Sequence, residues 1–350
     1  MKFKRALLLG SIFLALIVLA SALIAYIAQI RTSTHQPAGP SSTPIPSPTP
    51  SPTPSPTPTP VPTPFDGYGV YDSCSPNNNQ ATCLSNLDNM AAAGFKLVIN
   101  YEQLYGDANF QKAYLDHAQS VGMKVILALN KPELYNGTDL SSVFPNLAQT
   151  CNCSNNADFI RYVVNLVKNH PALWGYYIGD EVDPADHDQM KSALADIVHQ
   201  TDPTHPRLYI DTPQNSTAVW HQNSPFFDTA EVIGTDFYPI RDNSSNYPTI
   251  GQAGAVVSGT QAYANAHRED SAIVLQAFSY SNYNIPGTPY PTADQMEYML
   301  SQTLTYSHPR MILWYSYYDT MSSDNPTQHW NDLKSVIARN TPKNVPSPQV

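Results

Sequence analysis

The sequence predicts a (β/α)8 barrel over residues 65–340, preceded by a transmembrane helix and a Pro-rich linker. Eight short apolar segments alternate with segments of helical periodicity over about 280 residues, which is the size expected of a (β/α)8 barrel. No Gly-rich phosphate-binding loop follows any of these segments. This absence disfavours the alternative, a doubly wound open sheet.

The predicted strands are short, apolar and rich in β-branched residues, as the buried strands of a parallel sheet are. In chain order they are Gly67–Tyr71, Phe95–Tyr101, Met123–Asn130, Leu173–Glu181, Arg207–Asp211, Glu231–Tyr238, Ala272–Phe278 and Met311–Tyr317. Helical periodicity predicts helices at Gln80–Ala93, Ala108–Val121, Ala157–Asn169, Asp186–Gln200, Ala293–Tyr306 and Gln328–Arg339.

The N-terminal segment predicts a membrane anchor. A basic, cytoplasmic tip at residues 1–5 precedes an apolar run at residues 6–30. About 25 helical residues at ~1.5 Å each span a bilayer core of ~30 Å. Ala20-Ser21-Ala22 leaves a cleaved signal peptide, and hence a secreted domain, as the alternative. The apolar run continues to Ile27, which favours an uncleaved single-pass anchor in the cell membrane with the domain outside the cell.

Residues 31–64 form a linker rich in Pro, Ser and Thr, with repeated Ser-Pro-Thr-Pro. Such a segment builds no core and favours extended polyproline geometry, which at ~3.1 Å per residue would carry the domain up to roughly 90 Å from the membrane. Residues 341–350 form a C-terminal tail. The formal net charge of −10 argues against nucleic acid as a partner, and we expect a monomer.

Four cysteines, Cys74, Cys83, Cys151 and Cys153, fit an oxidising compartment. Four cysteines allow three pairings, of which we favour Cys74–Cys83 together with Cys151–Cys153. A metal site is the rival interpretation, but neither His-x-His nor Cys-x-x-Cys spacing supports it. We therefore expect no metal and no cofactor.

The fourth predicted strand ends in the carboxylate pair Asp180-Glu181. A charge at the end of an apolar strand is costly to bury, whereas the C-terminal rim of a barrel is where its active site lies. The structural alternative is a helix N-cap, for which Asp183 is an equal candidate. Neighbouring side chains of a strand alternate, so both carboxylates can face one site only if the chain turns at the rim.

Polar and aromatic residues end almost every other predicted strand. An aromatic ring covers the apolar face of a sugar, while amides and carboxylates hydrogen-bond its hydroxyl groups, so the pattern predicts a carbohydrate site. Single members have structural alternatives: Asn130 could end a strand, and Asp211 could organise a turn. The candidate binding residues are Tyr71, Tyr101, Asn130, Asp211, Tyr238, Gln276, Phe278, Trp314 and Tyr317, with Asp236 as a further catalytic candidate.

The domain resembles the (β/α)8 glycoside hydrolases of the large retaining clan that includes cellulase-like and β-galactosidase-like families. The resemblance depends on Gly179-Asp180-Glu181, Asp236-Phe-Tyr-Pro239 and Trp314. It implies that Glu181 is the acid/base. It also implies a nucleophilic glutamate on the seventh strand, where this chain has Gln276, and no Glu occurs between Ala272 and Gln295. A neutral amide cannot form the glycosyl ester of a retaining enzyme.

Three hypotheses accommodate the missing nucleophile. Asp236, or else Asp211 or Asp319, could activate water opposite Glu181, which an inverting enzyme does with carboxyl groups ~6.5–9.5 Å apart. Alternatively, Gly179-Asp180-Glu181-Val182 resembles a motif of the hexosaminidase-type glycosidases, which implies that Asp180 orients a substrate acetamido group that performs the attack. The third hypothesis is a barrel that binds glycans without cleaving them.

Overall fold

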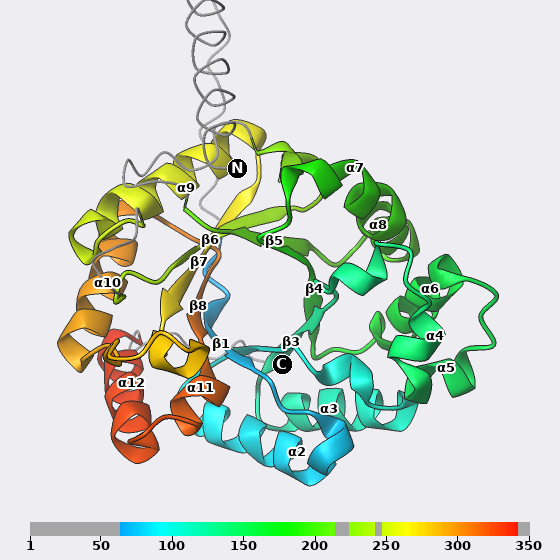
Figure 1. Cartoon of the computed structure of the whole chain (residues 1–350), viewed down its shortest axis with the longest axis horizontal. Coiled ribbons are helices and arrows are strands. Elements are labelled where there is room, and N and C mark those ends of the chain that lie inside the picture. The colour runs from blue at the N-terminus through cyan, green and yellow to red at the C-terminus, as the bar shows by residue number, and fades with distance from the viewer. Residues whose placement is uncertain (1–63, 214–223, 242–246, 342–350) are drawn as a thin grey trace, which may run out of the picture. The chain divides into compact units, whose positions relative to one another are not determined.

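Eight parallel strands form a closed barrel in the order β1 to β8, and helices surround it (Figure 1). This computed structural model describes residues 64–213, 224–241 and 247–341. The strands are β1 Gly67–Asp72, β2 Leu97–Asn100, β3 Lys124–Ala128, β4 Leu173–Asp180, β5 Arg207–Asp211, β6 Val232–Phe237, β7 Asp270–Gln276 and β8 Met311–Tyr315. The predicted (β/α)8 barrel is therefore confirmed.

Helices follow the strands on the outside of the barrel. The α-helices are α2 Pro76–Ala92, α3 Ala108–Ser120, α4 Leu140–Val143, α5 Pro145–Cys151, α6 Asn156–Val167, α7 His187–Met190, α8 Asp196–Thr201, α9 Ala253–His267, α10 Ala293–Tyr306, α11 Tyr317–Met321 and α12 Pro326–Asn340. Short 3-10 helices lie at Gln103–Tyr105, Pro132–Leu134, Pro184–Asp186, Pro225–Asp228, Ile250–Gln252 and Tyr280–Tyr283.

Three of the differences from the sequence prediction concern the helix after β4, the end of β8 and the helix after β6. The single helix expected at Asp186–Gln200 is divided into α7, a π-helical segment at Lys191–Ala195 and α8. The eighth strand ends at Tyr315 and α11 begins two residues later, whereas the sequence predicted a strand to Tyr317. Helix α9 was not predicted, because its many small residues give little contrast between an apolar and a polar face.

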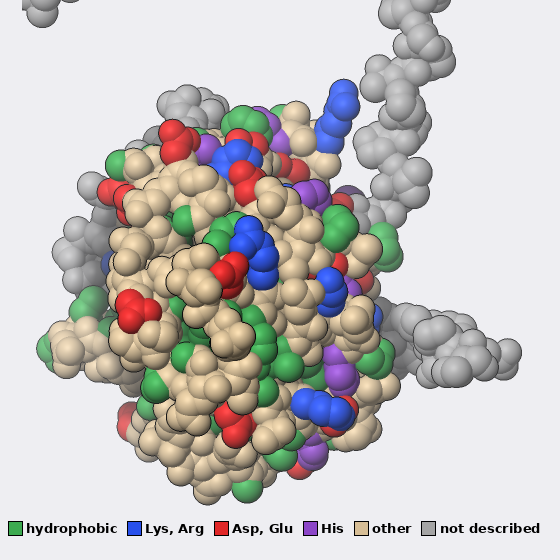
Figure 2. Space-filling view, turned by 90° about the vertical axis from the view of Figure 1, so that its right-hand side faces the viewer, with side chains coloured by type: hydrophobic (Ala, Val, Ile, Leu, Met, Phe, Trp, Pro, Cys, Tyr) green, Lys and Arg blue, Asp and Glu red, His purple; other side chains and the backbone are tan. Residues whose placement is uncertain are grey.

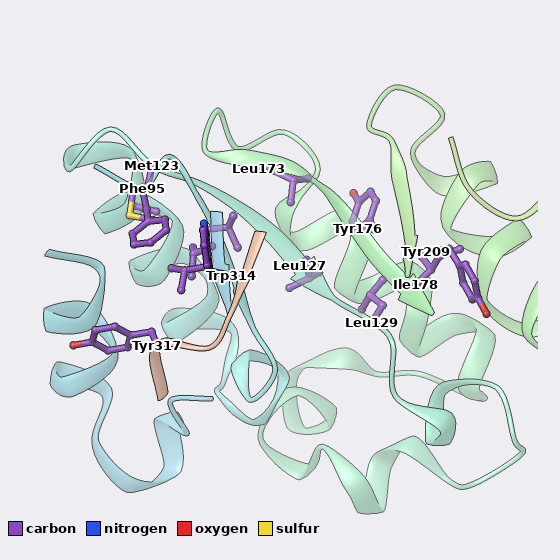
Figure 3. Packing of buried hydrophobic residues seen from close by; sticks show 14 of the residues in the cluster. Phe95, Met123, Leu127, Leu129, Leu173, Tyr176, Ile178, Tyr209, Trp314 and Tyr317 are labelled. Carbon is purple, nitrogen blue, oxygen red and sulfur yellow. The ribbon is translucent and has the colours of Figure 1, made fainter. Parts of the chain in front are cut away.

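Side chains alternate between two apolar layers. On β7, Ala272 and Val274 belong to the cluster inside the barrel, whereas Ile273 and Leu275 belong to the cluster between strands and helices. Figure 3 shows part of this outer cluster, with Trp314 of β8 among its members. The phase of the alternation at each strand end therefore decides which side chains reach the opening of the barrel.

Both favoured cysteine pairs are present: Cys74 with Cys83, and Cys151 with Cys153. The first ties the loop after β1 to α2, with a Cα–Cα distance of 5.4 Å.

Within the described ranges, no helix is both long and apolar enough to cross a membrane. The expected anchor at residues 6–30 and the linker, except Pro64, lie outside the described residues. On the face that Figure 2 shows, charged side chains of both signs are scattered, and hydrophobic side chains lie between them.

A polar cluster joins four segments at the N-terminal end of the barrel. Oδ2 of Asp66, just before β1, accepts hydrogen bonds from Nε1 of Trp174 on β4 and from Nε of Arg310, each at 2.7 Å. Arg310 also lies 5.1 Å from the centroid of a Trp174 ring and pairs with Asp270 at 3.2 Å. Trp174 itself belongs to the cluster inside the barrel, so this contact fixes the bottom of the inner core.

Replacement of Asp66 should destabilise the barrel. Asp66→Ala leaves the indole N–H of Trp174 without its acceptor and is expected to lower the free energy of unfolding by about 1–3 kcal/mol. Asp66→Asn, the matched control, keeps an oxygen that can accept from Trp174 and should cost less. Urea titrations followed by fluorescence measure both changes; equal stability of the Ala variant and the parent would contradict the role given to Asp66.

Candidate active site

A cavity of about 420 Å³ opens at the C-terminal ends of the strands. Its volume lies in the range typical of small-ligand sites. Carboxyl groups, tyrosines and one arginine make up most of its wall. The lining residues are Tyr71, Tyr101, Asp180, Glu181, Thr212, Asp236, Tyr238, Arg241, Tyr247, Phe278, Tyr280, Tyr283 and Tyr315.

The chain turns where β4 ends. Asp180 is the last residue of β4. Glu181 has a φ of 48°, in the left-handed region that residues other than glycine rarely adopt. The amide of Glu181 is still held by the carbonyl of Ile210 on β5, at 3.0 Å. This turn lets two consecutive carboxyl groups line one cavity, as the sequence required. Backbone strain of this kind, about 1–3 kcal/mol, concentrates at functional sites.

Asp180 is held by donors from the segments that follow β2 and β3. Its Oδ2 accepts a hydrogen bond from the hydroxyl of Tyr101 at 2.8 Å and one from Nδ2 of Asn130 at 3.2 Å. Burial raises the pKa of Asp180 to about 6, the charge of Glu181 adds to the increase, and these hydrogen bonds oppose it. Asp180 therefore ionises near neutral pH in a fixed orientation.

Asp236 of β6 lines the same cavity as Glu181. Burial raises the pKa of Asp236 well above its usual range, and its interactions with Glu181 raise it further. Its Oδ1 is buried and accepts no hydrogen bond from a donor in the described residues. Asp236 therefore keeps its proton to a higher pH than an exposed aspartate does. We call Glu181 and Asp236 the acidic pair.

Activation of water by Asp236 opposite Glu181 stays a prediction. An inverting pair must leave ~6.5–9.5 Å between its carboxyl groups for substrate and water, and a retaining pair about 5 Å.

Aromatic rings cover the floor and one wall of the cavity. Tyr315 of β8 lies near the centre of this group, with ring centroids 5.2 Å from Tyr71, 5.8 Å from Tyr238 and 5.6 Å from Phe278. Tyr71 also packs 5.4 Å from Tyr101. Rings with a polar hydroxyl at one edge suit a ligand that has both apolar C–H faces and hydroxyl groups.

The predictions for Trp314 and Tyr317 are corrected. Trp314 is fully buried in the outer cluster, on the helix side of the sheet, and does not line the cavity (Figure 3). The inner position at the end of β8 belongs to Tyr315, because side chains alternate along the strand. Tyr317 starts α11 and packs edge to face on Trp330, with ring centroids 4.9 Å apart.

Three other candidates support the site from beneath or outside. Asn130 holds Asp180 without lining the cavity. Gln276 is fully buried, and its side-chain amide pairs with the backbone of Ile240, accepting from N at 2.8 Å and donating to O at 2.9 Å. Asp211 accepts from the Tyr209 hydroxyl at 3.3 Å and from the Thr212 amide at 2.9 Å. Neither Gln276 nor Asp211 lines the cavity.

Sequence reasoning missed six lining residues. Thr212, Arg241, Tyr247, Tyr280, Tyr283 and Tyr315 all follow or end strands. Tyr315 could have been found from the strand alternation, had the end of β8 been known. The loop residues carry no periodicity, and only their place shortly after a strand end signals a role. In the described part of the chain, no group of three or more His, Cys, Asp or Glu residues is arranged to hold a metal ion.

Comparison with known proteins gives a fold but no close relative. No protein-family model matches the sequence, and no curated protein matches it significantly. Among solved structures, a putative α-L-fucosidase from Bacteroides thetaiotaomicron matches with a TM-score of 0.55 at 13% identity, over 83% of this chain and 99% of that one. The chain has a glycoside hydrolase-like (β/α)8 fold.

Two further structures agree in fold. An endo-β-1,4-mannanase from Thermotoga petrophila matches with a TM-score of 0.54 at 10% identity, over 82% of this chain and 79% of that one. A GH5_18 variant from Streptomyces cattleya in complex with Manβ1-4GlcNAc matches with a TM-score of 0.55 at 14% identity, over 82% and 83%. At such identities the likeness concerns the fold alone.

Removal of the tyrosine donor should shift the titration of Asp180. Tyr101→Phe deletes the 2.8 Å hydrogen bond that stabilises the ionised carboxylate, so the pKa of Asp180 should rise above its value of about 6. A carbon-13 NMR titration of the Asp180 carboxyl group measures the shift. Tyr317→Phe, which changes a tyrosine outside the cavity, is the control and should leave the titration unchanged. An unchanged or lower pKa in Tyr101→Phe would refute the assignment.

Proposed function

We propose that the protein is a glycoside hydrolase that cleaves an O-glycosidic bond of an oligo- or polysaccharide in the barrel-end cavity. The observation that carries the proposal is the presence of three carboxyl groups, Asp180, Glu181 and Asp236, in one cavity whose remaining wall is mostly aromatic. The glycoside hydrolase-like fold agrees with this reading, and the C-terminal end of such a barrel is where its active sites lie.

The proposed acid is the pair formed by Glu181 and Asp236. Burial and the charge of Glu181 raise the pKa of Asp236 well above its usual range, and the proposal is that the pair carries one proton when the substrate binds. Glu181 passes this proton to the glycosidic oxygen as the bond to the anomeric carbon breaks, and the bonding electrons leave with the alcohol. A water molecule finally supplies the hydroxyl group of the freed sugar and returns a proton to the pair.

A substrate-assisted reaction is the second candidate, and a specific observation favours it. Among the described residues that line the cavity, the carboxyl groups are those of Asp180 at the end of β4, Glu181 just after it and Asp236 on β6, and none lies at the end of β7. The amide of Gln276 is engaged with the backbone. A nucleophile supplied by a substrate acetamido group would complete the site, with Asp180, ionising near pH 6, accepting the N–H of that group.

We further propose that the chain is anchored in the cell membrane by residues 6–30, with the barrel outside the cell at the end of the linker. The apolar run, the basic tip and the Ser-Pro-Thr-Pro repeats support this arrangement. The two cysteine pairs fit an oxidising exterior.

Loss of either member of the acidic pair should remove activity. Glu181→Gln cannot protonate the leaving group, and Asp236→Asn replaces the shared proton by an amide that cannot release one. We expect turnover of aryl glycosides to fall by about 10²–10⁴-fold in each variant. Asp188→Asn, which changes a fully exposed carboxylate on α7, is the control for loss of one negative charge. Thermal unfolding of each variant separates loss of chemistry from loss of folding, and parental turnover in Glu181→Gln with an intact fold would disprove the proposed acid.

The nature of the nucleophile is tested with matched sugars. Purified full-length protein is incubated with pairs of chromogenic glycosides that differ only in having an N-acetyl or a hydroxyl group at C2, in both anomeric forms. If the acetamido group is the nucleophile, only the N-acetyl member turns over, and NMR of the first product shows retained configuration. Equal cleavage of both members excludes substrate assistance. Binding of either sugar with no turnover would replace the hydrolase proposal by a glycan-binding barrel.

A further inference from the structure

Arg241, just after β6, is the cation in the wall of the cavity. Four of the five other arginines of the barrel domain have an acidic partner: Arg161, Arg207, Arg310 and Arg339. No ion pair joins Arg241 to any carboxylate in the described ranges, and its Nε is buried without a hydrogen-bond partner there. A buried polar group without a partner is costly, so the position of Arg241 requires an explanation.

Two tyrosine rings hold the guanidinium group in place. Its central carbon lies 4.9 Å from the ring centroid of Tyr247 and 4.7 Å from that of Tyr280. The Tyr247 hydroxyl in turn donates to the carbonyl of Asp236 at 3.1 Å and accepts from the amide of Tyr238 at 3.0 Å. Arg241 therefore stacks on two tyrosine rings, one of which is hydrogen-bonded to the end of β6. These contacts set the orientation of the guanidinium group before any ligand binds.

The same rings connect Arg241 to the acidic pair. Burial raises the pKa of Tyr280 to about 12; the positive charge of Arg241 opposes this increase, and the charges of Asp236 and Glu181 add to it. Tyr280 thus lies within the electrostatic reach of both groups. The cavity has carboxyl groups that suit proton transfer and, next to them, a fixed cation that the proposed chemistry does not use.

We propose that Arg241 binds an oxyanion carried by the sugar, either the carboxylate of a uronic acid or a sulfate ester, so that the site selects acidic glycans. This inference rests on the proposed function and narrows its substrate class. A planar guanidinium group offers two parallel N–H donors to such an anion, and the interaction is strong where water is excluded. Simple neutralisation of the cavity carboxylates by Arg241 would predict no preference between acidic and neutral sugars.

Binding measurements on matched sugars test the proposal without depending on turnover. Calorimetry on purified full-length protein compares nitrophenyl glucuronides with nitrophenyl glucosides, in both anomeric forms, and glucose 6-sulfate with glucose. We expect the acidic member of at least one pair to bind roughly tenfold or more tightly than its neutral partner. The pair that shows the preference identifies the anion as carboxylate or sulfate.

Three variants make the result specific. Arg241→Gln should reduce the affinity for the acidic sugar to that for the neutral one, and Arg241→Lys, which keeps the charge but loses the planar fork, should retain part of the preference. Arg161→Gln removes a surface charge on α6 and should change nothing. The proposal is overturned if neither pair shows a preference for its acidic member, or if no sugar binds. It is also overturned if Arg241→Gln and Arg241→Lys each weaken binding of the acidic and the neutral sugar by the same factor. If the protein prefers acidic sugars but hydrolyses none of them, the role proposed for Arg241 stands and only the proposal that the protein is a hydrolase is rejected.

Discussion

Pairing of β1 with β8 is the constraint on which the site depends. The register runs from Gly67 opposite Met311 to Val70 opposite Trp314, and it closes the sheet so that all eight strands end around one opening. Closure also fixes which residues face inward. Gly69 is in contact with Leu313 across this seam, and a Cβ there would lie 2.4 Å from a Leu313 methyl group. The strands lie close enough together for their inward-facing side chains to fill the interior of the barrel. The cavity therefore forms at the C-terminal ends of the strands, beyond these packed side chains.

Glu181 and Asp236 give the opening its acidic character. Glu181 lies in the turn just after β4 and Asp236 on β6, and both line the cavity. Burial and the interactions with Glu181 raise the pKa of Asp236, so a proton is held above the usual range of an aspartic acid. The end of β7 contributes no carboxyl group to the described wall of the cavity. The site therefore offers a candidate acid more clearly than a candidate nucleophile.

The sequence predicts the barrel because each strand is a compact apolar run, and it predicts Asp180 and Glu181 because charge is anomalous at the end of such a run. The sequence does not predict which side chains of β8 face the inside of the barrel. Aromatic residues occupy positions 314, 315, 317 and 318, so their type alone does not show which one faces inward. The phase follows only from the pairing with β7, in which Gln276 lies opposite Tyr315. Arg241 and Tyr247 lie in a loop without periodicity, and only the fold brings them together.

Gln276 is part of the architecture that holds the barrel opening together. Its amide nitrogen donates to the carbonyls of Ile240 and Phe278, and its oxygen accepts from the amide of Ile240. These bonds join the segments after β6 and β7, from which Arg241 and Phe278 enter the cavity. A glutamate here could accept but, when ionised, could not donate, so both carbonyls would lose a partner and a charge would be fully buried. The glutamine is thus the residue that this arrangement of loops requires, and residue 276 offers no carboxylate nucleophile to the reaction proposed for this site.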